Sequence, residues 1–318
     1  MGGTNKIGSP CVSCLKEKLS QAKWLVRDNV AQDIINSLSD EEIRNLPTDL
    51  KKQLFKALID GHISSRDSQA LKRLLENKRF DEAGWLERDN IARKEINGMT
   101  DSEVAKLSNE KKIAYLRALQ SGYMSDADKA AQRKIYRNMP LEKDFKKFDD
   151  QKRNELVKKL KSDKIVQNAQ KNWSKLTEKE KLAAMQQVVK LQADTYGFSK
   201  TPEVKLYDKA PKNGMISNGT YKGSKIHLNK NKDSKFGTSF EKAVNVVTHE
   251  AAHHYQHELA EKFEKGKIPK SDPAYEQAKL FAINNESYVP SKEEFNTYQK
   301  QPLENHANRT GSKIEKSI

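Results

Sequence analysis

Residues 243–263 carry the sequence AVNVVTHEAAHHYQHELAEKF. Apolar residues recur in it at intervals of three and four, which predicts an amphipathic helix. His249 and His253 stand four residues apart on that helix with Glu250 between them, and side chains at this spacing project from one face. The two imidazoles can share one Zn²⁺ ion, and the intervening glutamate is placed to take a proton from water. The segment HEAAH therefore predicts a catalytic zinc site.

The same helix carries two further histidines that fit this site poorly. His254 is turned by about 100° from His253, and His257 lies about 12 Å along the axis from His249. Neither can share a metal ion with both members of the first pair. The third protein ligand must come from outside the helix.

The C-terminal half of the chain resembles a known family over about residues 173–311. The resembling segments are NWSKLTEKEKLAAMQQVVKLQADTYGF (172–198), KIHLN (225–229), THEAAHHYQ (248–256), DPAYEQAKLF (272–281) and YQKQPLENHA (298–307). They are similar to zincin metallopeptidases of the gluzincin type, which occur among bacterial secreted effectors and polymorphic toxins. In that family the glutamate of the QPxE motif is the third zinc ligand. The resemblance implies that Glu304 completes the shell with His249 and His253.

Local sequence also favours Glu304 as the third ligand. Pro302 suits the first turn of a helix, which would place this glutamate near a rigid helix start. Glu286 and His306 remain the alternative third ligands. A shell of two histidines and one glutamate leaves the fourth position to water, as catalytic zinc requires.

These assignments lead to a hypothesis for the mechanism of hydrolysis. Zinc acidifies water and polarises the scissile carbonyl, while Glu250 takes the water's proton and delivers it to the leaving amine. The developing oxyanion needs a further donor. Tyr298 is the first choice for it, with Tyr288 and His254 as the other candidates. Strand 225–230 resembles the edge strand on which zincins lay an extended substrate.

The first half of the chain contains an internal repeat. A shift of 61 residues aligns WLVRDNVAQDIINSLSDEE (24–42) with WLERDNIARKEINGMTDSE (85–103) without a gap. Each copy predicts three short helices, with Gly61 as a helix stop in the first. The Arg-Asp-Asn trio after each tryptophan is expected to form a buried corner that fixes helix ends. The duplication predicts a module for targeting, docking or regulation.

The predicted fold is mainly α, with a duplicated helical N-terminal domain and an α+β, zincin-like metallopeptidase domain that contains a small sheet. Strands are expected at EVKLY (203–207) and KIHLNK (225–230). Thr177 and Glu180 form a capping-box pattern at the start of a helix that Gly197 ends. The predicted order is a flexible tail (1–18), helical repeats (19–79 and 80–140), a helical linker (141–172) and the zinc metallopeptidase domain (173–318).

Composition excludes several classes of protein. The 318 residues include 59 Lys and Arg against 44 Asp and Glu, a net charge of +15. This excess is spread over lysine-rich helical faces, so no specific nucleic-acid partner is expected. No apolar run is long enough to span a membrane, and the N-terminus lacks the apolar core of a signal peptide. Cys11 and Cys14 form a lone CxxC, which we assign to an ordinary tail.

The leading functional hypothesis is a zinc metalloendopeptidase that cleaves a protein or peptide substrate. The resemblance implies an effector or toxin made in the cytoplasm and secreted by a signal-peptide-independent route into a target cell or periplasm. A secretion-machine carrier or a cognate immunity protein is the expected partner. A related option is a zinc amidase or peptidase acting on cell-wall peptides. The alternative is a zinc-containing, non-catalytic binding protein whose basic repeats grip a protein or polyanion. Glu250 favours the enzyme, because a structural zinc site needs no acid between its histidines.

Overall fold

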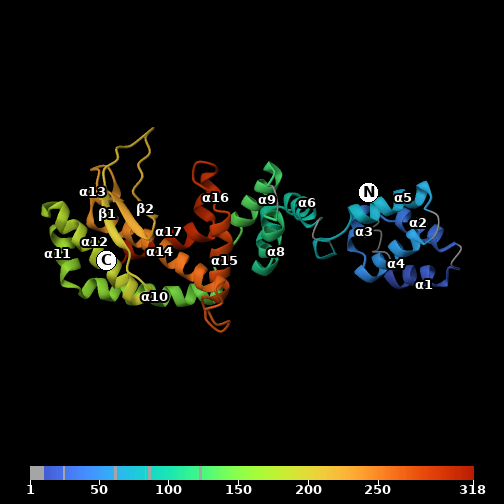
Figure 1. Ribbon diagram of the computed structural model, residues 1–318, viewed down its shortest axis with the longest axis horizontal. Helices are drawn as coiled ribbons and strands as arrows, with labels where there is room; N and C mark the ends of the chain where they lie inside the picture. The colour runs from blue at the N-terminus through green and yellow to red at the C-terminus, as the bar shows by residue number, and fades with distance from the viewer. Residues whose placement is uncertain (1–10, 24–25, 61–62, 83, 85–86, 122–123) are drawn as a thin grey trace, which may run out of the picture. The chain divides into compact units, whose positions relative to one another are not determined.

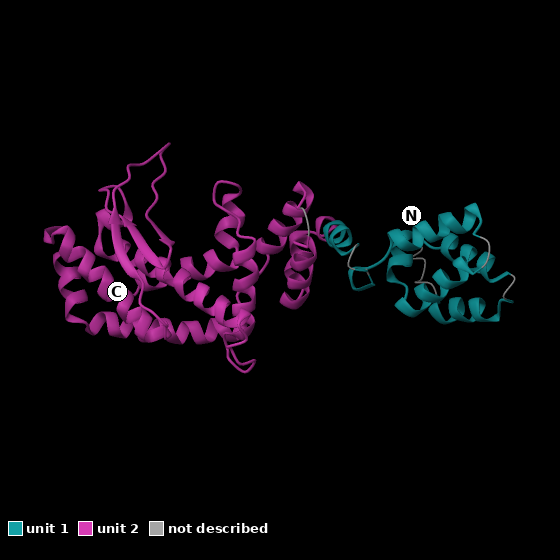
Figure 2. Cartoon of the chain, viewed as in Figure 1, with its two compact units in different colours: residues 1–95 teal, residues 96–318 magenta. Residues whose placement is uncertain are grey.

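The computed structural model describes residues 11–23, 26–60, 63–82, 84, 87–121 and 124–318. The chain is mainly helical with a small three-stranded sheet, which confirms the predicted fold class (Figure 1). It divides into two compact units, residues 1–95 and 96–318 (Figure 2). Within the described ranges, no helix is both long and apolar enough to cross a membrane.

The first unit is a small helical domain with its own core. Its helices are α1 (Val12–Gln21), α2 (Arg27–Ser37), α3 (Asp40–Asn45), α4 (Thr48–Ile59) and α5 (Ser65–Glu76), followed by a 3-10 turn at Phe80–Glu82. Ile35, Leu50 and Leu54 are fully buried at its centre. The expected flexible tail is helical from Val12 onward. Cys11 caps α1 and is joined to Cys14 by a disulfide within one turn.

The 61-residue repeat recurs helix for helix. The copies of α2–α5 are α6 (Arg88–Gly98), α7 (Asp101–Lys106), α8 (Asn109–Leu119) and α9 (Asp126–Arg137). Each copy thus has four helices, not three, because the Arg-Asp-Asn trio opens a helix of its own. These trios are half-buried to exposed, so the expected buried corner is wrong. Trp24, Trp85 and Gly61 lie outside the described residues.

The predicted linker is part of the second unit's core. Residues 141–172 contain the whole of α10 (Lys143–Ser162) and α11 (Lys164–Asn172), which lead through a 3-10 turn at Trp173–Lys175 to α12 (Glu178–Tyr196). Phe145 and Leu160 are fully buried in the same cluster as Val188 and Val247. The lysines between them lie on the solvent face. Because they dominate the composition of this segment, the sequence predicted a linker and not a buried helix. The compact core of the second unit therefore includes α10.

The sheet contains one strand more than predicted. Strands β1 (Glu203–Tyr207) and β3 (Lys225–Asn229) lie where expected, and β2 (Gly219–Lys222) arises in the loop between them. The strand order is β1-β3-β2, with β3 parallel to β1 and antiparallel to β2. Because β3 is central, the predicted substrate edge at residues 225–230 is wrong. The edge next to α14 (Phe240–Glu264) is β2.

Helix α14 is buried along most of its length, and α13 (Lys235–Thr238), α15 (Tyr275–Glu286) and α17 (Pro302–Glu315) pack against it. Helix α16 (Phe295–Lys300) lies between α15 and α17 in the chain. Helix α17 crosses α14 closely at Gly311, where an added Cβ would lie 2.6 Å from the Asn245 carbonyl oxygen. This close approach brings the first turn of α17 beside the histidines of α14.

Candidate metal centre

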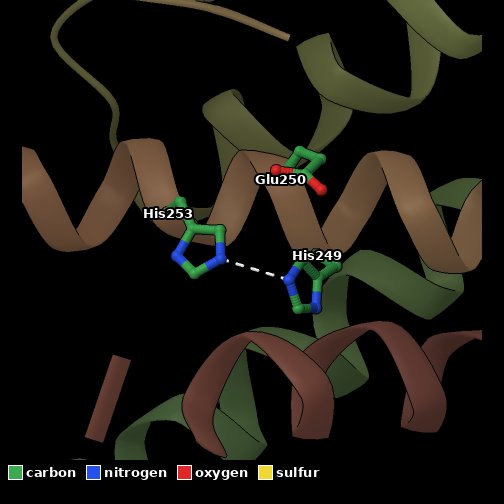
Figure 3. Close-up of side chains that lie close together, drawn as sticks. All are labelled: His249, Glu250 and His253. Carbon is green, nitrogen blue, oxygen red and sulfur yellow. Dashed lines mark hydrogen bonds between the residues drawn. The ribbon is translucent and has the colours of Figure 1, made fainter. Parts of the chain in front are cut away.

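Helix α14 presents His249 and His253 side by side. Their Nε2 atoms are 3.1 Å apart, and Figure 3 shows the two rings on one face of the helix. One candidate ligand atom from each of His249, Glu250 and His253 lies within 4.8 Å of the others. Two imidazole nitrogens that face each other this closely suit a shared cation, because each directs a lone pair into the same space.

Helix α17 adds Glu304 to the pair. Pro302 occupies the first helical position, as the sequence predicts. The carboxylate places Oε1 at 3.4 Å from His253 Nε2 and Oε2 at 3.6 Å from His249 Nε2. Oε2 is buried and has no hydrogen-bond donor among the described residues. Two imidazole nitrogens and one carboxylate, one of whose oxygens lacks a donor, fit a Zn²⁺ ion.

The two alternative third ligands lie elsewhere. Glu286 is exposed and lines a separate cavity together with Gln132 of α9. His306 is fully buried, and its ring nitrogens bond Gln256 and Asp149. The structure thus brings together His249, Glu250, His253 and Glu304 and separates them from both alternatives.

A hydrogen-bond relay fixes the tautomer of His253. The Nε2 amide of Gln256 donates to the Leu303 carbonyl at 2.8 Å and to Nδ1 of His306 at 2.8 Å. Because a carbonyl can only accept, the amide orientation is settled, and Gln256 Oε1 must accept from His253 Nδ1 at 2.9 Å. His253 therefore carries a proton on Nδ1, which leaves Nε2 as the ring nitrogen that faces Glu304 and would bind a cation.

The relay ends on a buried carboxylate. Since Nδ1 of His306 accepts from Gln256, its Nε2 donates to Asp149 Oδ1 at 3.2 Å. Tyr196 donates to the same oxygen at 3.0 Å, and Arg153 forms an ion pair with the other one. Burial by itself raises the pKa of Asp149, but His306 and Arg153 outweigh it and hold that pKa below its ordinary value. Sequence reasoning missed this relay, since no local pattern marks it.

The pKa values of His249, His253 and Glu304 indicate which of these groups hold a proton that a cation would displace. Burial lowers the pKa of His249 to about 3. Burial also lowers that of His253, but its hydrogen bond and charge interaction with Glu304 prevail and raise it to about 9. Burial by itself raises the pKa of Glu304, but its hydrogen bond and charge interaction with His253 prevail and lower that pKa to about 2. A metal ion would displace the proton held between His253 and Glu304.

Glu250 has the properties of a general base. It is 7 % exposed, and burial raises its pKa to about 7. Figure 3 shows it projecting from a different side of α14 than the two rings. Strand β2 passes close to it, since a Cβ on Gly219 would lie 3.1 Å from Glu250 Oε1. A carboxylate with this pKa can accept and return a proton at neutral pH.

The three predicted oxyanion donors occupy different places. Tyr298 lines the cleft beside His249 and Glu250, and burial together with the Glu304 charge raises its pKa, so it keeps its proton. Tyr288 donates to Glu304 Oε1 at 2.6 Å and therefore orients that carboxylate. His254 bonds Tyr221 at 2.9 Å and lies 3.0 Å from Glu258, so its ring is engaged outside the cleft.

The cleft lined by His249, Glu250 and Tyr298 has a volume of about 730 Å³. The positively charged residues of its lining are Lys209, Lys212 and Lys235. Comparison of the chain with models of known protein families, with curated proteins and with solved structures gives no match.

Proposed function

We propose that this chain is a zinc-dependent metallopeptidase whose metal ion is held by His249, His253 and Glu304. The observation that carries the proposal is the buried Oε2 of Glu304, which has no donor in the part of the chain that the structure describes and faces the paired Nε2 atoms. Zinc bound there would polarise the scissile carbonyl and acidify the attacking water. A purely structural zinc site would not need Glu250, the buried glutamate that lines the cleft.

The chain's own residues supply the remaining chemistry. Glu250 takes the proton of the attacking water and returns it to the leaving amine. Tyr298 donates a hydrogen bond to the oxyanion that develops on the substrate. The exposed edge of β2 pairs with an extended peptide backbone, and Gly219 allows this strand to lie against α14 beside the general base.

The cleft charges favour a substrate with acidic residues near the cleaved bond. Lys209, Lys212 and Lys235 line the cleft, and Lys235 is held by Asn245 at 2.9 Å. The family resemblance extends the proposal to a bacterial effector or toxin that is exported without a signal peptide. In that setting the repeats dock the enzyme to a carrier, an immunity protein or its target.

Three variants test the proposal. Glu250→Gln should retain zinc, measured by elemental analysis, and lose cleavage of a mixed peptide library followed by mass spectrometry. Glu304→Ala should lose zinc, whereas Glu286→Ala, a change of an exposed glutamate outside the site, should keep it. Cleavage by the Glu250→Gln protein would contradict the general-base assignment. Wild-type protein that takes up no zinc would contradict the metal site itself.

A further inference from the structure

The two repeats share an internal framework, so their surfaces can be compared position by position. In each copy a buried lysine and a second cation bind backbone carbonyls at positions that differ by 61. The lysine bonds are Lys51 to Arg44 O (2.8 Å) in the first copy and Lys112 to Ala105 O (3.2 Å) in the second. The bonds of the second cation are Arg73 to Leu38 O (2.9 Å) and Lys134 to Met99 O (2.7 Å). The α4/α5 pair of the first copy is therefore the structural counterpart of the α8/α9 pair of the second.

The C-terminal end of helix α15 packs against the α8/α9 face, and α16 packs against α9. Gln120 donates to the Ser287 hydroxyl at 2.5 Å, Gln132 donates to the Ser287 carbonyl at 3.1 Å, and Tyr136 bonds the same hydroxyl. Leu116 and Tyr136 are fully buried. In this copy the face receives the C-terminal end of a helix and holds it through polar side chains.

The counterpart face of the first repeat is open and apolar. Leu116, Gln120 and Tyr136 correspond to Phe55, Ile59 and Leu75, which are 37 %, 43 % and 37 % exposed. A groove of about 230 Å³ runs between α4 and α5, with Phe55 and Leu75 in its wall. We call Phe55, Ile59 and Leu75 the repeat-1 face. Exposed apolar side chains gathered on one face are typical of an interaction site.

The surrounding charges indicate which occupant suits this face. Lys52 lines the groove, and Lys56 lies one turn further along α4. In the described part of the chain neither lysine has an ion-pair partner. Two copies of this chain, each with a net charge of +15, repel one another. An acidic partner is favoured over a second copy.

We infer that the repeat-1 face binds a helix of another protein, in the manner in which the second repeat binds α15. That helix presents an apolar side chain where α15 has Ser287 and carries acidic residues beside it. The inference does not depend on the proposed zinc activity. It gives the two copies different partners, one within the chain and one outside it.

A peptide derived from α15 serves as the probe. It comprises residues 273–288 with Lys279→Glu, and is made both with Ser287 and with Ser287→Leu. Binding of the labelled peptides to the full-length protein is measured by fluorescence anisotropy. The protein variants are I59Q/L75Y, which installs the second repeat's own residues, and the control I165Q, which alters an exposed isoleucine of α11.

The leucine peptide should bind wild-type protein and I165Q equally, and about tenfold or more tightly than the serine peptide does. Its affinity should fall about tenfold or more in I59Q/L75Y. Equal binding to all three proteins, or no binding to wild type up to about 1 mM, would overturn the inference. Dimerisation of the wild-type protein that I59Q/L75Y abolishes would instead assign the face to a second copy.

Discussion

Replacing Gln256 by leucine should weaken zinc binding without touching a metal ligand. The fully buried amide of Gln256 accepts from His253 Nδ1 and donates to Leu303 O and His306 Nδ1. Leucine has a similar volume but removes all three bonds. His253 can then rotate and exchange its proton between the two ring nitrogens, so Nε2 is no longer reserved for the cation.

The size of the effect follows from what the substitution leaves behind. Loss of a residue that orients a metal-bound histidine costs about 10- to 100-fold in metal affinity, or about 1.4 to 2.8 kcal/mol. The Leu303 carbonyl and His306 Nδ1 also lose a donor in a buried setting. Each buried polar group left without a partner costs about 1–3 kcal/mol. The metal-free variant should therefore also unfold at lower denaturant concentration than wild type.

Zinc affinity is measured by competition with a chromophoric chelator, and stability by urea unfolding in the presence of EDTA. Gln277→Leu is the matched control, because Gln277 is fully buried in the same unit and accepts from the Glu142 amide at 2.8 Å, away from the ligands. It should lose stability and keep its zinc affinity. If Gln256→Leu binds zinc as tightly as the control does, the tautomer argument is refuted. If the wild type binds none, the metal site is refuted instead.

Three further predictions concern stability and substrate access. Asp149→Asn should destabilise the protein at pH 7. The difference in stability from wild type should narrow as pH falls below about 4, since a carboxylate with a lowered pKa loses its contribution when it is protonated. Urea midpoints from pH 7 to 3 measure this difference, and a constant difference would contradict the prediction. Gly311→Ala should cost about 1–3 kcal/mol in thermal unfolding, because its Cβ would meet the Asn245 carbonyl at 2.6 Å, whereas Gly98→Ala, with open space around it, should not be destabilised. Gly219→Val should cut peptide cleavage while zinc content stays the same, because a Cβ there already lies 2.6 Å from a side-chain carbon of α14; unchanged turnover would argue against substrate pairing along β2.

Local signals in the sequence predicted the elements that depend on neighbouring residues. The capping box of Thr177 with Glu180, the left-handed Gly197 at φ 72° and the helix start at Pro302 are all found in the structure. Each depends on residues within one or two helical turns. The spacing of His249 and His253 likewise placed both rings on one face.

Features that depend on distant packing escaped sequence reasoning. Strand β2 is only four residues long, which is too short for an alternating pattern to stand out, and it is fixed by its pairing with β3. In α10, Asp149 and Arg153 resemble an exposed salt bridge, yet both are buried against α17 and α12. Gln256 looks like an ordinary polar residue until His306 and Leu303 are brought beside it.

The position of Asp149 bears on how such a domain can be inherited. A recombination event that joined the chain at Trp173 would transfer all three proposed zinc ligands and the general base. It would leave behind α10, and with it the carboxylate to which His306 donates. His306 would then be buried without its acceptor, and the relay to His253 would lose its anchor. A unit that keeps this relay intact therefore begins ahead of Lys143, about thirty residues before Trp173.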